Sequence, residues 1–143
     1  MEPITRQCVL GLLVGDWADY IPRYQSLSPA AQAAFLQQQG YKRLADLLAH
    51  IVAWWQFGMQ AIPRFQADPA ARMAEIDVDS FNARAVQQVQ AVSDADEIKA
   101  FEVARQKFLD LTRQLSDDDF KDERILTQIR WELVNHLEDH RIK

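Results

Sequence analysis

The sequence predicts an all-α protein: a four-helix bundle with a long crossover between helices two and three, plus two short helices. Long stretches are rich in Ala, Leu, Gln, Glu, Lys and Arg, which favour helix. Only four glycines occur in 143 residues, and no Asn-Gly or Asp-Gly hairpin signal is present. Apolar residues recur at helical spacing in four long segments, which is typical of a bundle of amphipathic helices.

Length and charge limit the class of protein. At 143 residues and 16.5 kDa the chain is expected to form a single domain over residues 1–143. A net charge of −5 argues against binding to nucleic acid or an anionic membrane surface, and no apolar run approaches the length of a transmembrane span. We therefore expect a cytoplasmic protein. Cys8 is the only cysteine, which excludes an internal disulfide, and its apolar neighbours favour a place in the core.

The first helix is expected from Ile4 to Tyr24, with apolar residues at three-, four- and six-residue steps. Pro22 should kink or end it, because proline cannot donate the interior hydrogen bond. Ser28 followed by Pro29 is a strong helix start, and it opens a short helix that stops at Gly40.

The second helix is expected over about 41–62, ending near Pro63, with His50 on its apolar side. The helical pattern fades over 64–79, which indicates the crossover. A second short helix is expected at about 80–89.

The third helix is expected to begin after Ser93, with a weak variant of a capping box and a buried stripe that reaches Leu115. The fourth is expected over about 123–142. Its apolar stripe includes His136 and His140.

The three histidines of the chain form a candidate metal site. His136 and His140 are four residues apart, so a helix places both imidazoles on one face, and His50 on another helix supplies a third nitrogen. Three ligands leave positions open for water or substrate, as in catalytic sites. An ion there would lower the pKa of bound water to about 7 or hold a thiol as thiolate. The alternative is three core histidines that hydrogen-bond one another.

Two acidic residues precede histidines by one helical turn. Asp46 and Glu132, each four residues before a histidine, are candidate acceptors for the second ring proton of His50 and His136. The alternative is that both carboxylates are simply solvated.

Four further residues are candidates for the pocket. Leu47 and Trp54 flank His50 at helical spacing and could wall the pocket, although the same spacing is typical of core residues. Asn82 and Arg84 could approach the substrate from the crossover; helix capping or a surface ion pair is the alternative.

Other catalytic motifs are absent. HLEDH is not the HExxH zinc motif, because Leu137 stands where the general-base glutamate belongs. The chain has no Gly-rich phosphate loop, no GxSxG and no cysteine-based zinc pattern.

Three segments carry a resemblance to a known superfamily: LADLLAHIVAWW around His50, DSFNARAVQQ followed by AFEVARQKFLDLTRQLSDDDF, and the closing NHLEDH. The chain resembles the DinB/YfiT-like superfamily over roughly residues 40–141, and the second segment is similar to the branch containing the ClbS/DfsB proteins.

The resemblance implies a four-helix bundle, often a homodimer, with nickel or zinc held by His50, His136 and His140. It further implies an enzyme that uses the metal to activate a low-molecular-weight thiol or water against a small electrophilic substrate. A non-catalytic stress or self-protection protein that sequesters a small molecule is one alternative. A structural helical dimer is another.

Overall fold

Every regular element that the computed structural model describes, over residues 3–143, is helical, and no strand occurs among these residues. The all-α prediction is thereby confirmed. None of the described helices is long and apolar enough to cross a membrane. The elements are α1 (Arg6–Val14), α2 (Tyr20–Ser26), α3 (Pro29–Gln39), α4 (Leu44–Ala67), α5 (Val78–Gln87), α6 (Asp94–Gln114), the 3₁₀ turn η1 (Asp119–Lys121), α7 (Glu123–Ile129), the π-helix η2 (Arg130–Asn135) and α8 (His136–Asp139).

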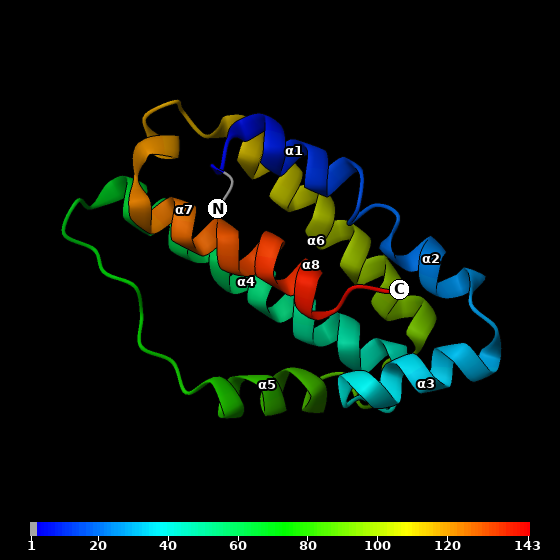
Figure 1. The fold of residues 1–143 in the computed structure, drawn as a ribbon. Coiled ribbons are helices and arrows are strands. Elements are labelled where there is room, and N and C mark those ends of the chain that lie inside the picture. The colour runs from blue at the N-terminus through cyan, green and yellow to red at the C-terminus, as the bar shows by residue number, and fades with distance from the viewer. Residues whose placement is uncertain (1–2) are drawn as a thin grey trace.

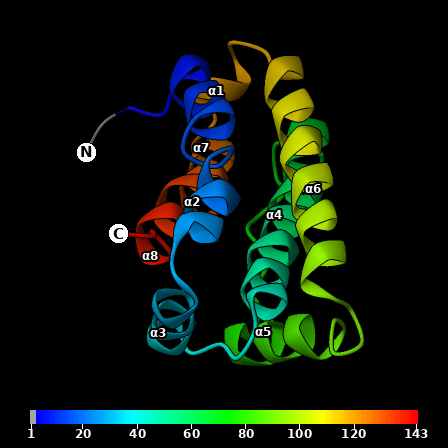
Figure 2. The same ribbon diagram turned by 90° about the vertical axis from the view of Figure 1, so that its right-hand side faces the viewer.

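The main helices lie side by side in two layers (Figures 1 and 2). One layer contains α1 with α2 and the continuous C-terminal segment α7–η2–α8; the other contains α4 and α6. Large aromatic side chains fill the space between them. Trp17 and Trp55 are fully buried and meet edge to face with ring centroids 4.9 Å apart, and Phe101 lies 5.0 Å from Trp55. Such pairs stabilise the fold beyond their buried area.

The prediction of one continuous first helix from Ile4 to Tyr24 is wrong. Helix α1 ends at Val14, and α2 begins only at Tyr20. The intervening turn buries Trp17, whose indole N–H donates to the carbonyl of Leu133 at 3.0 Å. Pro22 does not cause the break: it lies in the first turn of α2, where backbone N–H groups have no partner within the helix.

Cys8 is exposed, so its predicted place in the core is wrong. It lies on the outer side of α1, whereas Val9 and Leu13 point inward and are fully buried. A helix buries one stripe only, and apolar neighbours in sequence do not decide which residues lie on it.

The short helix α3 has the predicted ends. Ser28 accepts a hydrogen bond from the amide of Ala31 at 3.1 Å, and Gly40 adopts the left-handed conformation with φ of +83°. Glycine adopts this conformation without steric cost.

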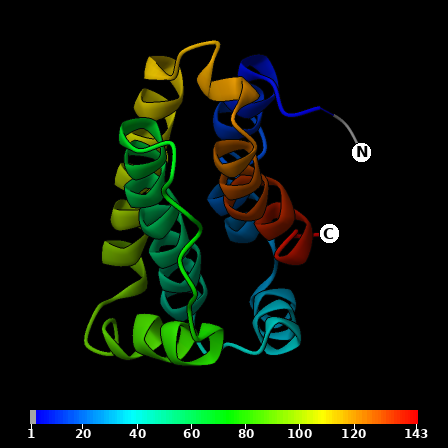
Figure 3. The same ribbon diagram turned by 90° about the vertical axis from the view of Figure 1, so that its left-hand side faces the viewer.

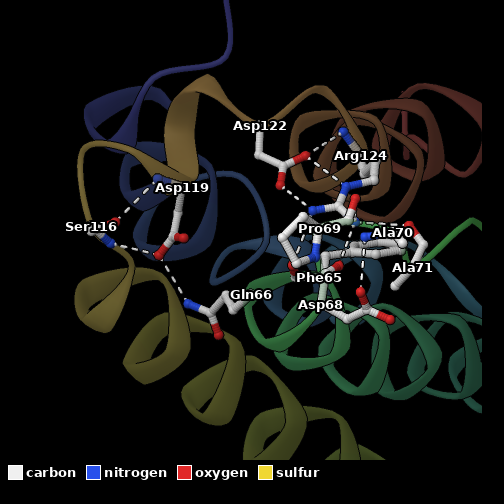
Figure 4. A network of polar contacts seen from close by, with 10 residues as sticks. All are labelled: Phe65, Gln66, Asp68, Pro69, Ala70, Ala71, Ser116, Asp119, Asp122 and Arg124. Atoms are coloured by element: carbon white, nitrogen blue, oxygen red, sulfur yellow. Dashed lines mark hydrogen bonds and ion pairs between the residues drawn. The ribbon is translucent and has the colours of Figure 1, made fainter.

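Helix α4 continues past Pro63 to Ala67, beyond its predicted end. The continuation buries Phe65, which is 2% exposed. Arg124 secures this end of the helix (Figure 4): its guanidinium donates to the carbonyls of Phe65 at 3.0 Å and Ala71 at 2.8 Å and pairs with Asp122 at 2.6 Å. Tertiary contacts therefore outweigh the hydrogen bond that proline removes.

The crossover follows α4 and returns to the end of the molecule at which α4 begins, where α5 lies (Figures 1 and 3). Helix α5 begins at Val78, two residues before the predicted start, and packs against α4. It lies at the same end of the molecule as α3 (Figure 3). The third helix, α6, begins after Ser93 as predicted, with the serine hydroxyl accepting from the amide of Asp96 at 3.1 Å.

The C-terminal segment is helical from Glu123 to Asp139 rather than to Ile142, and its middle is a π-helix over Arg130–Asn135. Side chains from other helices and turns donate hydrogen bonds to backbone carbonyls of this stretch. The indoles of Trp17 and Trp55 donate to the carbonyls of Leu133 and Glu132 at 3.0 and 2.9 Å. π-Segments inside α-helices occur frequently at functional sites.

Candidate metal centre

The structure brings the three histidines together. His50 lies in the middle of α4, His136 opens α8 directly after the π-helix, and His140 follows the last residue of α8. One ligand nitrogen from each ring lies within 4.8 Å of the others. The ring centroids are 4.9 to 5.7 Å apart. Two separate helical segments of the fold thus supply one cluster that could hold a metal ion.

The tautomer of His50 follows from its neighbours. Asn82 on α5 accepts a hydrogen bond from the indole N–H of Trp54 at 2.7 Å, which identifies the contacting atom as the amide oxygen, since indole can only donate. The same oxygen lies 3.1 Å from Nδ1 of His50. Nδ1 must therefore carry the proton, and the lone pair of His50 is on Nε2.

The other two rings are oriented in the same way. His136 donates from Nδ1 to the backbone carbonyl of Glu132 at 3.1 Å, and Nδ1 of His140 lies 2.6 Å from Oε1 of Gln39. An oxygen acceptor behind each ring nitrogen is the usual second contact of a metal-ligating histidine. All three Nε2 atoms are left as acceptors or ligands.

The spacing of one pair of Nε2 atoms suits a cation. Those of His50 and His140 are 3.1 Å apart. Two nitrogens bound to one tetrahedral zinc at about 2.0–2.1 Å lie about 3.4 Å apart, so this pair needs only a small relaxation to hold an ion. Two facing lone pairs repel, and a cation between them replaces that repulsion with two bonds. Three neutral imidazoles are a donor set that zinc and nickel both accept.

Burial keeps the three rings neutral, as metal ligation requires. It is the main cause that lowers the pKa of His136 to about 4 and of His140 to about 3, with a further contribution from the charge of His50. The pKa of His50 is also lowered by burial, against the opposing effects of Asn82 and of the charge of Asp139.

The backbone that carries the histidines is anchored by core side chains. The carbonyl of Glu132, which orients His136, also accepts from the indole of Trp55. The hydroxyl of Tyr20 donates to the carbonyl of His140 at 2.7 Å and so secures the end of α8. Aromatic side chains of the core therefore hold, by hydrogen bonds, the backbone carbonyls next to the histidine cluster.

The carboxyl group of Glu132 is buried beside the cluster. The residue is 1% exposed, and Oε2 accepts from the side-chain amide of Gln128 at 3.1 Å. Gly58 on α4 makes room for it, since a Cβ there would lie 2.7 Å from Cγ and Oε2 of Glu132. Burial raises the pKa of Glu132 to about 8, so the group is mainly protonated at neutral pH.

A pocket of about 610 Å³ opens onto the histidines. Its volume lies within the range of small-molecule sites. Besides the histidines and Glu132 it is lined by Tyr41, Trp54, Phe57, Ala74, Ile76, Val78, Asn82, Trp131, Asn135 and Asp139. A ligand in this pocket can therefore contact the histidine cluster.

Three other predicted residues belong to the site. Trp54 lines the pocket, as expected for a wall residue. Asn82 also lines it, but holds His50 through its amide oxygen. Glu132 serves His136 through its backbone carbonyl and not through its carboxylate.

Three predicted site residues lie elsewhere. Leu47 is fully buried in the core and does not line the pocket. The carboxylate of Asp46 pairs with Arg43 at 2.9 Å and contacts no histidine. Arg84 is exposed on α5 and does not line the pocket.

Sequence reasoning missed several site residues. Gln39 orients His140 from 101 residues away, and Trp131 and Tyr41 line the pocket. The ring of Tyr41 lies 5.7 Å from that of His50, and burial, with the charge of Asp46, raises its pKa to about 12. No local motif in the sequence marks Gln39 or Tyr41 as site residues. Trp131 could have been found, because it is next to the candidate residue Glu132.

Comparison of the chain with protein-family models, with curated proteins and with solved structures finds no match in any of the three.

Proposed function

We propose that this protein is a metal-dependent enzyme of the DinB/YfiT-like type, built as a four-helix bundle and working as a homodimer on a small electrophilic substrate. The Nε2 atoms of His50, His136 and His140 would hold nickel or zinc. The observation that carries the proposal is the common orientation of these rings, each with an oxygen acceptor behind Nδ1 and its Nε2 toward the cluster.

A divalent ion held there would lower the pKa of a bound water or low-molecular-weight thiol toward neutrality. The chain's own residues supply the rest. Asn82, Gln39 and the carbonyl of Glu132 keep the rings in the ligating tautomer. The pocket that opens onto the cluster offers a largely apolar surface to a bound substrate.

Elemental analysis tests the metal site. The protein is purified without a histidine tag, incubated with nickel or zinc, desalted and measured for bound metal. We expect close to one equivalent in the wild type, and loss of it in His136→Ala and in His140→Ala. Absence of bound metal under every loading condition would refute the proposal.

A matched pair of variants tests the orientation of His140. Gln39→Ala removes the acceptor for Nδ1, whereas Gln38→Ala changes an exposed neighbour on the same helix. We expect the first to weaken metal binding by about 10- to 100-fold and the second to leave it unchanged. Equal affinities would show that Gln39 does not orient the ligand.

Turnover separates the enzyme from a protein that sequesters its ligand. The loaded protein is mixed with 1-chloro-2,4-dinitrobenzene, alone and with 2-mercaptoethanol, cysteine or glutathione. If the protein is an enzyme, it should consume the electrophile at least about tenfold faster than the His50→Ala variant does. Activation of a nucleophile by a positioned acid or base commonly accelerates a reaction by more than that factor. Stoichiometric binding without faster consumption would favour sequestration.

A further inference from the structure

The pocket over the histidine cluster has walls that are mostly apolar and aromatic. Trp54 and Phe57 come from α4, Ile76 and Val78 from the end of the crossover and the start of α5, and Trp131 from the π-helix. Three separate parts of the fold thus contribute apolar surface to one pocket. Residues this far apart in sequence share a surface only because the tertiary structure brings them together.

Two of these wall residues are largely in contact with solvent. Val78 is 51% and Trp131 is 47% exposed, and they are among the few large apolar side chains with such exposure in residues 3–143. Single exposed apolar residues are ordinary. Here both line the same pocket as the half-buried Trp54 and Phe57, so a ligand that fills it removes apolar surface from water on several sides.

The charge of the lining is as informative as its apolar character. Among the described residues that line the pocket none is Lys or Arg. The polar groups besides the histidines are the neutral side chains of Tyr41, Asn82 and Asn135 and the carboxyl groups of Glu132 and Asp139. A phosphate or carboxylate away from the histidines would therefore lose its hydration without gaining a cationic partner.

We propose that the ligand of this pocket is a small, predominantly aromatic or aliphatic molecule whose body is uncharged, with a single polar head at the histidine cluster. The assignment of the head rests on the proposed function; the assignment of the body rests on the walls alone. Nucleotides, sugar phosphates and thiols that carry carboxylates remote from sulfur are thereby disfavoured, whereas neutral thiols and apolar electrophiles fit.

Binding by the metal-loaded protein is measured with two probes that share one head. Benzohydroxamic acid has an uncharged ring, and 4-carboxybenzohydroxamic acid adds a remote carboxylate to it. We expect the first to bind at least about tenfold more tightly, in calorimetric titration at one ionic strength. Equal affinities would overturn the inference.

The walls are tested separately in protein stripped of metal with a chelator. 4-Nitroanisole and 4-nitrobenzoate, which both quench tryptophan fluorescence, are titrated against it. The neutral compound should bind more tightly, and Trp131→Ala should weaken its binding by about two- to tenfold, the range expected for loss of an aromatic contact. No preference, or no effect of Trp131→Ala, would overturn the inference.

A pair of charge substitutions controls for general effects. Val78→Lys adds the missing cation at the pocket, and Val103→Lys adds one at an equally exposed position of α6 that does not line it. Binding of 4-nitrobenzoate should tighten by about two- to fivefold in the first variant and stay unchanged in the second. Identical behaviour of the two variants would contradict the proposed walls.

The two proposals fail independently. A protein that holds no metal but prefers 4-nitroanisole refutes the enzyme and supports the assignment of the body. A protein that holds metal but binds both hydroxamates equally supports the metal centre and refutes that assignment.

Discussion

Gly58→Ala is the most direct test of how the histidine cluster is supported. Gly58 lies inside α4, where alanine is intrinsically better than glycine by about 1 kcal/mol. A Cβ at this position, however, would meet Cγ and Oε2 of Glu132 at 2.7 Å, closer than van der Waals contact allows. Overpacking a core in this way costs about 1–3 kcal/mol. The net effect on the free energy of unfolding is a loss of about 0–2 kcal/mol.

Gly11→Ala is the matched control. Gly11 is also helical, but a Cβ there meets nothing within 4 Å, so only the gain of about 1 kcal/mol remains. The two variants should therefore differ by about 1–3 kcal/mol, or roughly 3–10 °C in Tm for a domain of this size. Thermal unfolding followed by circular dichroism at a fixed scan rate measures this difference.

The overlap also affects the site, because displacement of Glu132 moves the carbonyl that orients His136. We expect Gly58→Ala to weaken metal binding by about tenfold or more, and Gly11→Ala to leave it unchanged. In a Glu132→Ala background the stability penalty of Gly58→Ala should disappear. Equal stabilisation by Gly58→Ala and Gly11→Ala would refute the packing of Glu132 against α4.

Three further results are expected. Because the pKa of Glu132 in the folded protein is raised to about 8, the unfolded chain releases a proton between about pH 4.5 and 8 that the folded chain retains. The free energy of unfolding of the metal-free protein should therefore fall with rising pH in this window, relative to that of Glu132→Gln. Urea denaturation of both proteins at pH 5 and pH 8 measures this. The same difference in stability between them at both pH values would contradict the prediction. Arg124→Lys should destabilise the protein by about 1.5–3 kcal/mol, because an ammonium group cannot replace the several bonds of the guanidinium, whereas the exposed Arg113→Lys should be neutral in the same denaturation assay. The exposed thiol of Cys8 should react with one equivalent of 5,5′-dithiobis(2-nitrobenzoate) in the native protein, and a reaction that requires denaturant would show that it is buried.

Much of the helical structure followed from local signals. The serine and proline at 28 and 29 cap and start a helix through neighbouring backbone groups, and Gly40 ends it through its own φ angle. Such features depend on residues a few positions apart, so the sequence alone predicts them. The convergence of His136 and His140 on one side follows from helical periodicity in the same way.

Predictions failed where distant contacts compete with local preference. The first helix is interrupted at the turn that holds Trp17, whose buried indole donates to the carbonyl of Leu133, 116 residues away. Helix α4 passes through Pro63 because Phe65 packs in the core and Arg124 secures the end. Neither contact is visible in a window of the sequence.

By itself, the sequence determined that the protein is helical, where most helices begin, and that its three histidines lie on helix faces suited to a shared site. Only the tertiary structure decided that Asn82, Gln39 and the carbonyl of Glu132 orient those rings, that Glu132 is a buried acid, and that a largely apolar pocket opens onto them. The physical reason is range: capping and periodicity act within a few residues, whereas hydrogen-bond acceptors and pocket walls are chosen by contacts between segments that meet only when the whole chain has packed.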